Sequence, residues 1–327
     1  MSNAHGAGVA TVALPPLEPV TQRFVDDLAA AGGKPLYQLS PADAHQVLTE
    51  LQSQPVRLLP VDIEDTTFPV GPTGTTDIRI VRPKGAKGIL PVVMYFHGGG
   101  WVLGDKITHD RLVRELAVGV NAAVVFVDYI NSPEAKYPTQ NEQAYAATQY
   151  VVEHAKELKV DASRLPVVGD SVGGNMVAAV TLMAKARKGP RISYQVLLYP
   201  VVEYMSNAKS MRDYEDGPWL TARTMKWMFD LQGLDGTQNE ITAFPLRATM
   251  DQLKGLPDAL FIFDDDILRD DGEAYAAKLS QAGVRVTSVR YNGTIHDFAM
   301  LNPLADTPAV RGAIQQVITT LKGVLGS

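Results

Sequence analysis

The sequence contains no cysteine among its 327 residues. This absence excludes disulfide bonds, a catalytic thiolate and any metal site built on cysteine ligands. The six histidines lie far apart and show none of the close pairings typical of a zinc site. Two glycine-rich stretches, at 97–104 and 169–174, lack the spacing that cradles a nucleotide phosphate. We therefore expect neither a metal ion nor a cofactor.

Positive charge is also scarce. The formal net charge is -6 at pH 7, the estimated pI is 5.5, and no run of lysine or arginine forms a basic stripe. A nucleic acid or an anionic membrane surface would need such a stripe, so we expect neither as a partner. No apolar run is long enough to span a bilayer. The N-terminus lacks a signal peptide's basic start, and Pro15 and Pro16 break its short apolar run, so we expect a cytoplasmic protein.

The apolar residues that are present gather in short runs typical of buried strands. Such runs occupy 92–96, 122–127, 165–169, 195–199, 259–263 and 284–291. Helical periodicity separates most of them, which predicts an α/β fold with a mostly parallel sheet covered by helices on both faces. Segments 61–70 and 75–83 alternate like an antiparallel pair, and two helices at 20–31 and 40–52 precede every strand. The interval 201–250 contains helix-like patterns and no predicted strand.

A serine stands on a tight turn after one of these strands. The stretch VVGDSVGGN places Gly169 and Gly173 on either side of Ser171, between an apolar run and a helical pattern. A strand, Gly-x-Ser-x-Gly and a helix form the nucleophile elbow, in which small neighbours let the chain turn sharply and present the serine hydroxyl. Ser171 is the candidate nucleophile.

A serine nucleophile needs a base and an acid that orients the base. In this architecture the chain order is serine, acid, histidine. Only His296, after the last predicted strand, lies where a loop could return it to Ser171. Asp264, Asp265 and Asp266 leave the preceding strand, and their spacing alone does not separate them.

Charge that develops on a substrate carbonyl oxygen must be stabilised by preorganised N–H donors. The stretch HGGGWVLG, at 97–104, follows the predicted strand at 92–96. Its glycines would let backbone amides approach a substrate closely. This stretch is the candidate oxyanion loop.

These motifs resemble the hormone-sensitive-lipase-like family of α/β hydrolases, bacterial esterases that carry HGGG and GDSAGG. The resemblance covers nearly the whole chain and includes DYINSPEAKYP at 128–138 and DILRDDGEAYAAKLSQAGV at 266–284. It implies the α/β-hydrolase fold. It also implies that Asp266 is the triad acid, with Asp264 as the fallback, and that Gly98, Gly99 and Val172 donate the oxyanion amides.

The resemblance further implies a domain organisation. Residues 1–54 and the insertion at 201–250 would form a helical cap, and residues 55–200 and 251–327 the catalytic domain. The implied activity is hydrolysis of carboxylic esters with short- to medium-chain acyl groups, about C4 to C8, through an acyl-enzyme. A small-molecule ester is the expected partner, and association into a homodimer is left open.

Other functions also remain open from the sequence. The same residues could cleave an amide, lactone or carbamate, or could transfer the acyl group to an alcohol. A catalytically silent binder is a third reading, because the fold also carries lapsed triads.

Two residues depart from the family pattern. Val172 replaces a usual alanine, and we expect its β-branched side chain to narrow the site. Asp297 replaces the glycine that commonly follows the histidine. If its carboxylate faces the site it should raise the pKa of His296, and if it points to solvent it should have little effect.

Overall fold

The computed structural model describes residues 14–326. Residues 1–13 and residue 327 lie outside the described residues. Two predictions therefore fall partly outside them: the cap segment at 1–54 and the N-terminal stretch without a signal peptide. Within residues 14–326, no helix combines the length and apolar character that a bilayer crossing requires.

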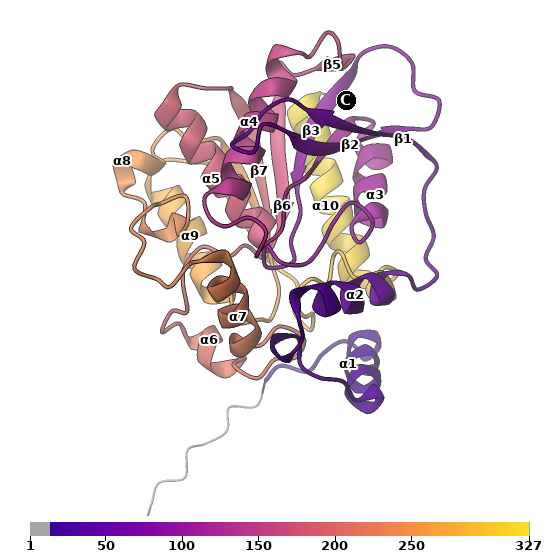
Figure 1. The fold of residues 1–327 in the computed structure, drawn as a ribbon, viewed down its shortest axis with the longest axis vertical. Coiled ribbons are helices and arrows are strands. Elements are labelled where there is room, and N and C mark those ends of the chain that lie inside the picture. The colour runs from indigo at the N-terminus through magenta and orange to yellow at the C-terminus, as the bar shows by residue number, and fades with distance from the viewer. Residues whose placement is uncertain (1–13, 327) are drawn as a thin grey trace, which may run out of the picture.

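A nine-stranded sheet forms the centre of the described chain (Figure 1), in the order β1-β2-β4-β3-β6-β7-β8-β9, and β5 pairs with β3. Its strands are β1 (Val61–Phe68), β2 (Thr76–Pro83), β3 (Leu90–Phe96), β4 (Ala123–Asp128), β5 (Val160–Asp161), β6 (Leu165–Asp170), β7 (Ile192–Leu198), β8 (Asp258–Phe263) and β9 (Val286–Arg290). β1 and β2 pair antiparallel, β2 meets β4 antiparallel, and the other pairings are parallel. The predicted fold class is confirmed.

Each of the six apolar runs forms a strand, and burial differs between the centre and the edge of the sheet. β6 is fully buried and β3 and β4 nearly so, because each lies between two neighbouring strands. β9 carries no buried residue. The expectation that this last run is buried on both faces is wrong, because β9 is the edge strand and pairs only with β8. The two-residue strand β5 was not predicted, since so short a pairing leaves no periodic signal.

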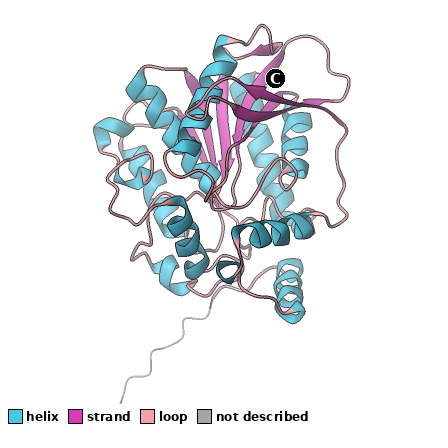
Figure 2. Ribbon diagram, in the orientation of Figure 1, coloured by secondary structure: helices cyan, strands magenta, loops and turns pink. Residues whose placement is uncertain are grey.

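Helices cover both faces of the sheet, as Figures 1 and 2 show. α3 (Asp110–Val120) and α10 (Pro308–Leu325) pack together on one face, and α4 (Thr139–Glu153) and α5 (Val172–Arg187) on the other. α9 (Arg269–Gln281) contacts β8 and β9, and the short α8 (Met250–Leu253) packs on α9. The buried apolar residues of strands and helices form one continuous core.

The remaining helices gather at one end of the molecule, at the bottom of Figure 1. They are α1 (Pro19–Ala31), α2 (Pro41–Gln52), α6 (Lys209–Asp213) and α7 (Ala222–Gln232). The Ser40 and Thr221 side chains cap α2 and α7 by accepting backbone N–H groups, as helix N-cap residues do. Phe24 of α1 packs against Trp219 of the insertion, with ring centroids 5.8 Å apart. The N-terminal helices and the 201–250 segment therefore meet.

Candidate active site

Ser171 lies on the turn between β6 and α5, with φ 54° and ψ −119°. This backbone conformation is strained for a residue with a side chain, and such strain is typical of functional sites. Two hydrogen bonds hold the turn: Ser171 N–H donates to the Leu198 carbonyl at 2.9 Å, and Val201 N–H donates to the Ser171 carbonyl at 3.2 Å. A Cβ at Gly173 would overlap the Phe96 carbonyl oxygen, so this position requires glycine. The local geometry is that of a nucleophile elbow.

Three side chains from different loops meet at this turn. Ser171 Oγ lies 2.8 Å from Nε2 of His296, and Nδ1 of His296 lies 2.5 Å from Oδ2 of Asp266. All three residues are at least 96% buried, with 4%, 2% and 3% of their surface exposed. Because an ionised carboxylate can only accept, the Nδ1–H of His296 donates to Asp266, which leaves Nε2 free to accept the serine proton.

The three neighbouring aspartates have different surroundings. Asp265 forms an ion pair with Arg269 at 3.3 Å. Asp264 is fully buried, and no hydrogen bond to its carboxylate oxygens is found within residues 14–326. Burial, reinforced by the nearby charge of Asp266, raises the pKa of Asp264 well above its usual value. Of the three predicted candidates, only Asp266 contacts His296 directly.

One group of histidine and acidic side chains in the described part of the chain is compact enough to hold a metal ion. It consists of Asp264, Asp266 and His296, whose ligand atoms lie within 4.8 Å of one another. A zinc ion needs about 2 Å to each ligand, and the 2.5 Å between Nδ1 and Oδ2 leaves no room for a cation between them. The geometry therefore fits a hydrogen-bonded pair better than a metal centre.

The glycine-rich loop after β3 approaches Ser171. Gly99 and Gly100 line the pocket that contains Ser171, and the N–H groups of these two glycines find no acceptor among the described residues. Gly99 has φ 102°, which favours glycine. Val172 begins α5, where an N–H group has no intrahelical acceptor. The structure corrects the prediction for Gly98, because its N–H already donates to Oδ1 of Asp170 at 3.1 Å.

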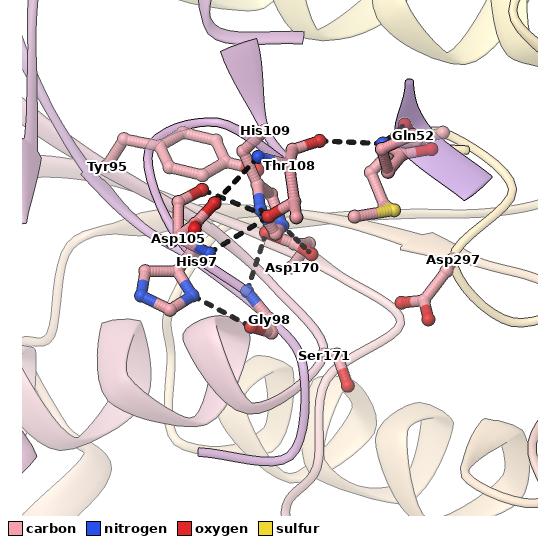
Figure 3. A network of polar contacts seen from close by, with 12 residues as sticks. Gln52, Tyr95, His97, Gly98, Asp105, Thr108, His109, Asp170, Ser171 and Asp297 are labelled. Atoms are coloured by element: carbon pink, nitrogen blue, oxygen red, sulfur yellow. Dashed lines mark hydrogen bonds and ion pairs between the residues drawn. The ribbon is translucent and has the colours of Figure 1, made fainter. Parts of the chain in front are cut away.

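Asp170 is the centre of a buried polar network behind the loop (Figure 3). Its Oδ1 also accepts the Tyr95 hydroxyl at 2.6 Å, and its Oδ2 lies 3.2 Å from Nε2 of His109. Burial alone would raise the pKa of Asp170 and lower that of His109. Their mutual attraction outweighs burial, so the pKa of Asp170 is lowered and that of His109 is raised. Each partner therefore favours the charged form of the other, and the pair fixes the start of the Gly98 loop.

His97 begins the same loop and is not part of the serine–histidine contact. It stacks on Tyr129, with ring centroids 4.0 Å apart, and its Nδ1 lies 2.8 Å from the Gly98 carbonyl. Burial and the charge of His109 lower the pKa of His97 to about 3. The ring is therefore neutral and donates through Nδ1, which stiffens the loop. Sequence reasoning missed both His97 and the His109–Asp170 pair as supports of the loop.

A mostly apolar pocket opens above Ser171. Both the N-terminal helical segment and the 201–250 insertion contribute to its wall, and most of the contributed side chains are apolar. The lining residues are Leu36, Val47, Leu48, Gly99, Gly100, Leu103, Ser171, Trp219, Leu220, Thr224, Met225, Met228, His296 and Asp297. The Val172 side chain is fully buried in the core and is not among them. The predicted narrowing of the site by Val172 is therefore wrong.

Asp297 faces the site. Its Oδ1 lies 3.4 Å from Nε2 of His296, and its Oδ2 accepts the indole N–H of Trp219 at 2.9 Å. With φ 65°, it adopts a conformation that glycine favours, in keeping with the family residue it replaces. Burial alone would lower the pKa of His296, but the charge of Asp297 and the hydrogen bond with Asp266 outweigh it and raise that pKa above 6.5. Of the two orientations considered for Asp297, the structure has the one that strengthens the base.

Comparison with known proteins agrees with this geometry. Residues 93–300 match a family described as alpha/beta hydrolase fold. Carboxylesterase NlhH of Mycobacterium tuberculosis is 36% identical, over 92% of this chain and 96% of its own. The structure of a thermostable esterase from Pseudomonas putida ECU1011 has 50% identity and a TM-score of 0.93, covering 96% of this chain and 99% of that one. A variant of the esterase rPPE complexed with (S)-Ac-CPA has 49% identity and a TM-score of 0.92, covering 98% and 99%.

These similarities extend over nearly the whole chain and over every segment that contributes to the site. The names of these relatives describe a carboxylesterase and two esterases. The chain therefore belongs to the hormone-sensitive-lipase-like family of the alpha/beta hydrolase fold and is a carboxylic ester hydrolase.

Proposed function

We propose that the chain hydrolyses esters through an acyl-enzyme formed on Ser171, with His296 as the general base and Asp266 as the acid that orients it. The observation that carries this proposal is the continuous hydrogen-bonded path from Ser171 Oγ through His296 to Asp266, at 2.8 and 2.5 Å. Asp264 is not assigned this role, because its carboxylate oxygens accept no hydrogen bond within residues 14–326, whereas Asp266 contacts His296 directly.

The reaction begins when Ser171 Oγ attacks the ester carbonyl carbon and its proton moves to Nε2 of His296. The tetrahedral intermediate collapses, the bond to the alcohol oxygen breaks, and Nε2 returns the proton to that oxygen. Water then attacks the acyl-enzyme with His296 again as base, and the carboxylic acid leaves as Ser171 regains its proton. Asp266 stabilises the imidazolium at each step without taking up its proton.

The negative charge on the carbonyl oxygen needs donors next to Ser171. We assign this role to the N–H groups of Gly99, Gly100 and Val172, which have no acceptor among residues 14–326 and lie beside the serine in the pocket or the chain. Gly98 supports them indirectly, since its own N–H is held by Asp170.

The substrate class follows from the pocket. Its wall is largely apolar and side chains from two helical segments close it, so we propose esters with short- to medium-chain acyl groups, about C4 to C8. Residues 1–54 and 201–250 are proposed as the two parts of one cap over a catalytic domain formed by 55–200 and 251–327. The contact between Phe24 and Trp219 supports this division.

The proposal is tested with p-nitrophenyl esters of increasing acyl length, together with matched anilides and lactones. We expect the highest kcat/KM for acyl groups of about four to eight carbons. Ser171→Ala should lower kcat by about 10⁴-fold or more and leave the unfolding transition in place. A fluorophosphonate probe should label the wild type and not this variant. Full activity in Ser171→Ala, or labelling at another residue, would overturn the assignment.

A further inference from the structure

One ionisable residue in the pocket has no part in the proposed mechanism. Asp297 is the only carboxylate that lines the pocket within residues 14–326, and its wall neighbours are mostly apolar. Asp297 forms no ion pair with a lysine or arginine of the described residues. The polar partners of its side chain among these residues are the Trp219 indole and the His296 ring. A buried carboxylate in such a wall acts on whatever part of the substrate comes near it.

The charge of Asp297 is least compensated in the state that reacts. His296 must be neutral to accept the serine proton, so no imidazolium then lies beside Asp297. Asp170 and His109, which also act on Asp297, are paired with each other behind the loop. Burial raises the pKa of Asp297, and the Trp219 hydrogen bond opposes this effect. In its ionised form Asp297 therefore gives this part of the pocket a net negative charge.

The reaction geometry decides which part of the ester meets that charge. Nε2 of His296 must hand its proton to the alcohol oxygen, so this oxygen comes within hydrogen-bonding distance of Nε2. Oδ1 of Asp297 lies only 3.4 Å from the same nitrogen. The carbonyl oxygen, by contrast, is held by the amides of Gly99 and Gly100. The first atoms beyond the alcohol oxygen therefore lie nearest to Asp297.

We propose that Asp297 determines specificity for the alcohol part of the ester and favours alcohols with a positively charged group about two carbons from the ester oxygen, as in amino-alcohol esters. The inference rests on the proposed serine mechanism, because that mechanism places the alcohol oxygen at Nε2. Esters whose alcohol part carries a carboxylate are disfavoured by the same charge.

The test compares two isosteric substrates, choline butyrate and 3,3-dimethylbutyl butyrate, which differ in charge and hardly in shape. Wild type and Asp297→Asn are measured with both at one pH. We expect the ratio of kcat/KM for the charged ester to kcat/KM for the neutral ester to be roughly tenfold lower in Asp297→Asn than in wild type. In wild type the same ratio should fall as the salt concentration rises, because salt screens the charge of Asp297. Because both substrates meet the same free enzyme, a changed pKa of His296 cancels in the ratio.

Asparagine is the appropriate replacement. It tolerates the left-handed conformation of this position and keeps an oxygen that can accept the Trp219 N–H. Turnover of the neutral ester by the same variant shows that it has folded. Asp306→Asn is the matched control, because Asp306 is exposed, lies outside the pocket wall and carries the same charge. Its ratio should equal that of wild type.

Each outcome has a distinct meaning. A ratio unchanged within about twofold between wild type and Asp297→Asn overturns this inference, and so does an equal change in Asp306→Asn. Better hydrolysis of carboxymethyl butyrate than of its carboxamide analogue by wild type also contradicts it. Turnover of all these esters by Ser171→Ala would instead overturn the proposed function.

Discussion

Replacing Asp297 by asparagine should shift the pH dependence of the enzyme. His296 accepts the serine proton only when neutral, so activity is lost as the pH falls through its pKa. Asp297, 3.4 Å from Nε2, raises that pKa. Its removal should lower the pKa and move the acidic limb of kcat/KM to lower pH.

The size of this shift can be worked from the distance. Two unit charges 3.4 Å apart attract by about 5 kcal/mol at an effective dielectric constant of about 20. The imidazolium charge is shared by two ring nitrogens, and Trp219 already donates to the carboxylate, so we take less than half of this value. The remaining interaction of about 2 kcal/mol corresponds to roughly one to two pKa units.

The assay is kcat/KM for p-nitrophenyl butyrate from about pH 5 to about pH 10, because this parameter reports the pKa of the free enzyme. Product is followed at the isosbestic wavelength of nitrophenol. Asp297→Gly, which introduces the usual family residue, should shift the limb in the same direction, and Asp306→Asn should leave it in place. An unmoved limb, or one moved to higher pH, would refute the electrostatic reasoning.

Two further predictions concern the aspartates around the site. Asp266→Asn should lower kcat by about 10⁴-fold, because the amide favours the wrong tautomer of His296. Asp264→Asn should lower kcat only slightly. Steady-state kinetics of both variants test this order, and the reverse order would make Asp264 the acid. Asp170→Ala should lower kcat more than KM changes and cost about 3 kcal/mol or more of unfolding free energy, since it leaves His109 as an unpaired buried charge. Asp170→Asn should recover much of the activity, and equal losses in both variants would show that the hydrogen bonds to Asp170 do not position the loop.

The strands and the catalytic order were predictable because each has a local signal. Buried parallel strands appear as continuous apolar runs, and the elbow needs small residues at fixed positions around Ser171. His296 followed from chain order alone. β9 shows the limit of this reasoning, because an edge strand and a central strand can share one pattern while only the sheet order decides their burial.

The details of the site depend on contacts between distant segments, which the sequence does not encode locally. Nothing in the chain near Gly98 indicates that its N–H is taken by Asp170, 72 positions away. His109 gives no motif at all. The orientation of Asp297 depends on Trp219, 78 positions away, which is why the sequence left both orientations open.

The hydrogen bond from Trp219 to Asp297 also links two equilibria. While it is made, the indole N–H stabilises the carboxylate and shares its charge with the imidazole. Without this bond the pKa of Asp297 would rise, and a protonated Asp297 would no longer raise the pKa of His296. By thermodynamic reciprocity, a proton on His296 favours the ionised form of Asp297 and with it the hydrogen bond from Trp219. The pocket wall at Trp219 and the protonation of the base are therefore coupled through one carboxylate.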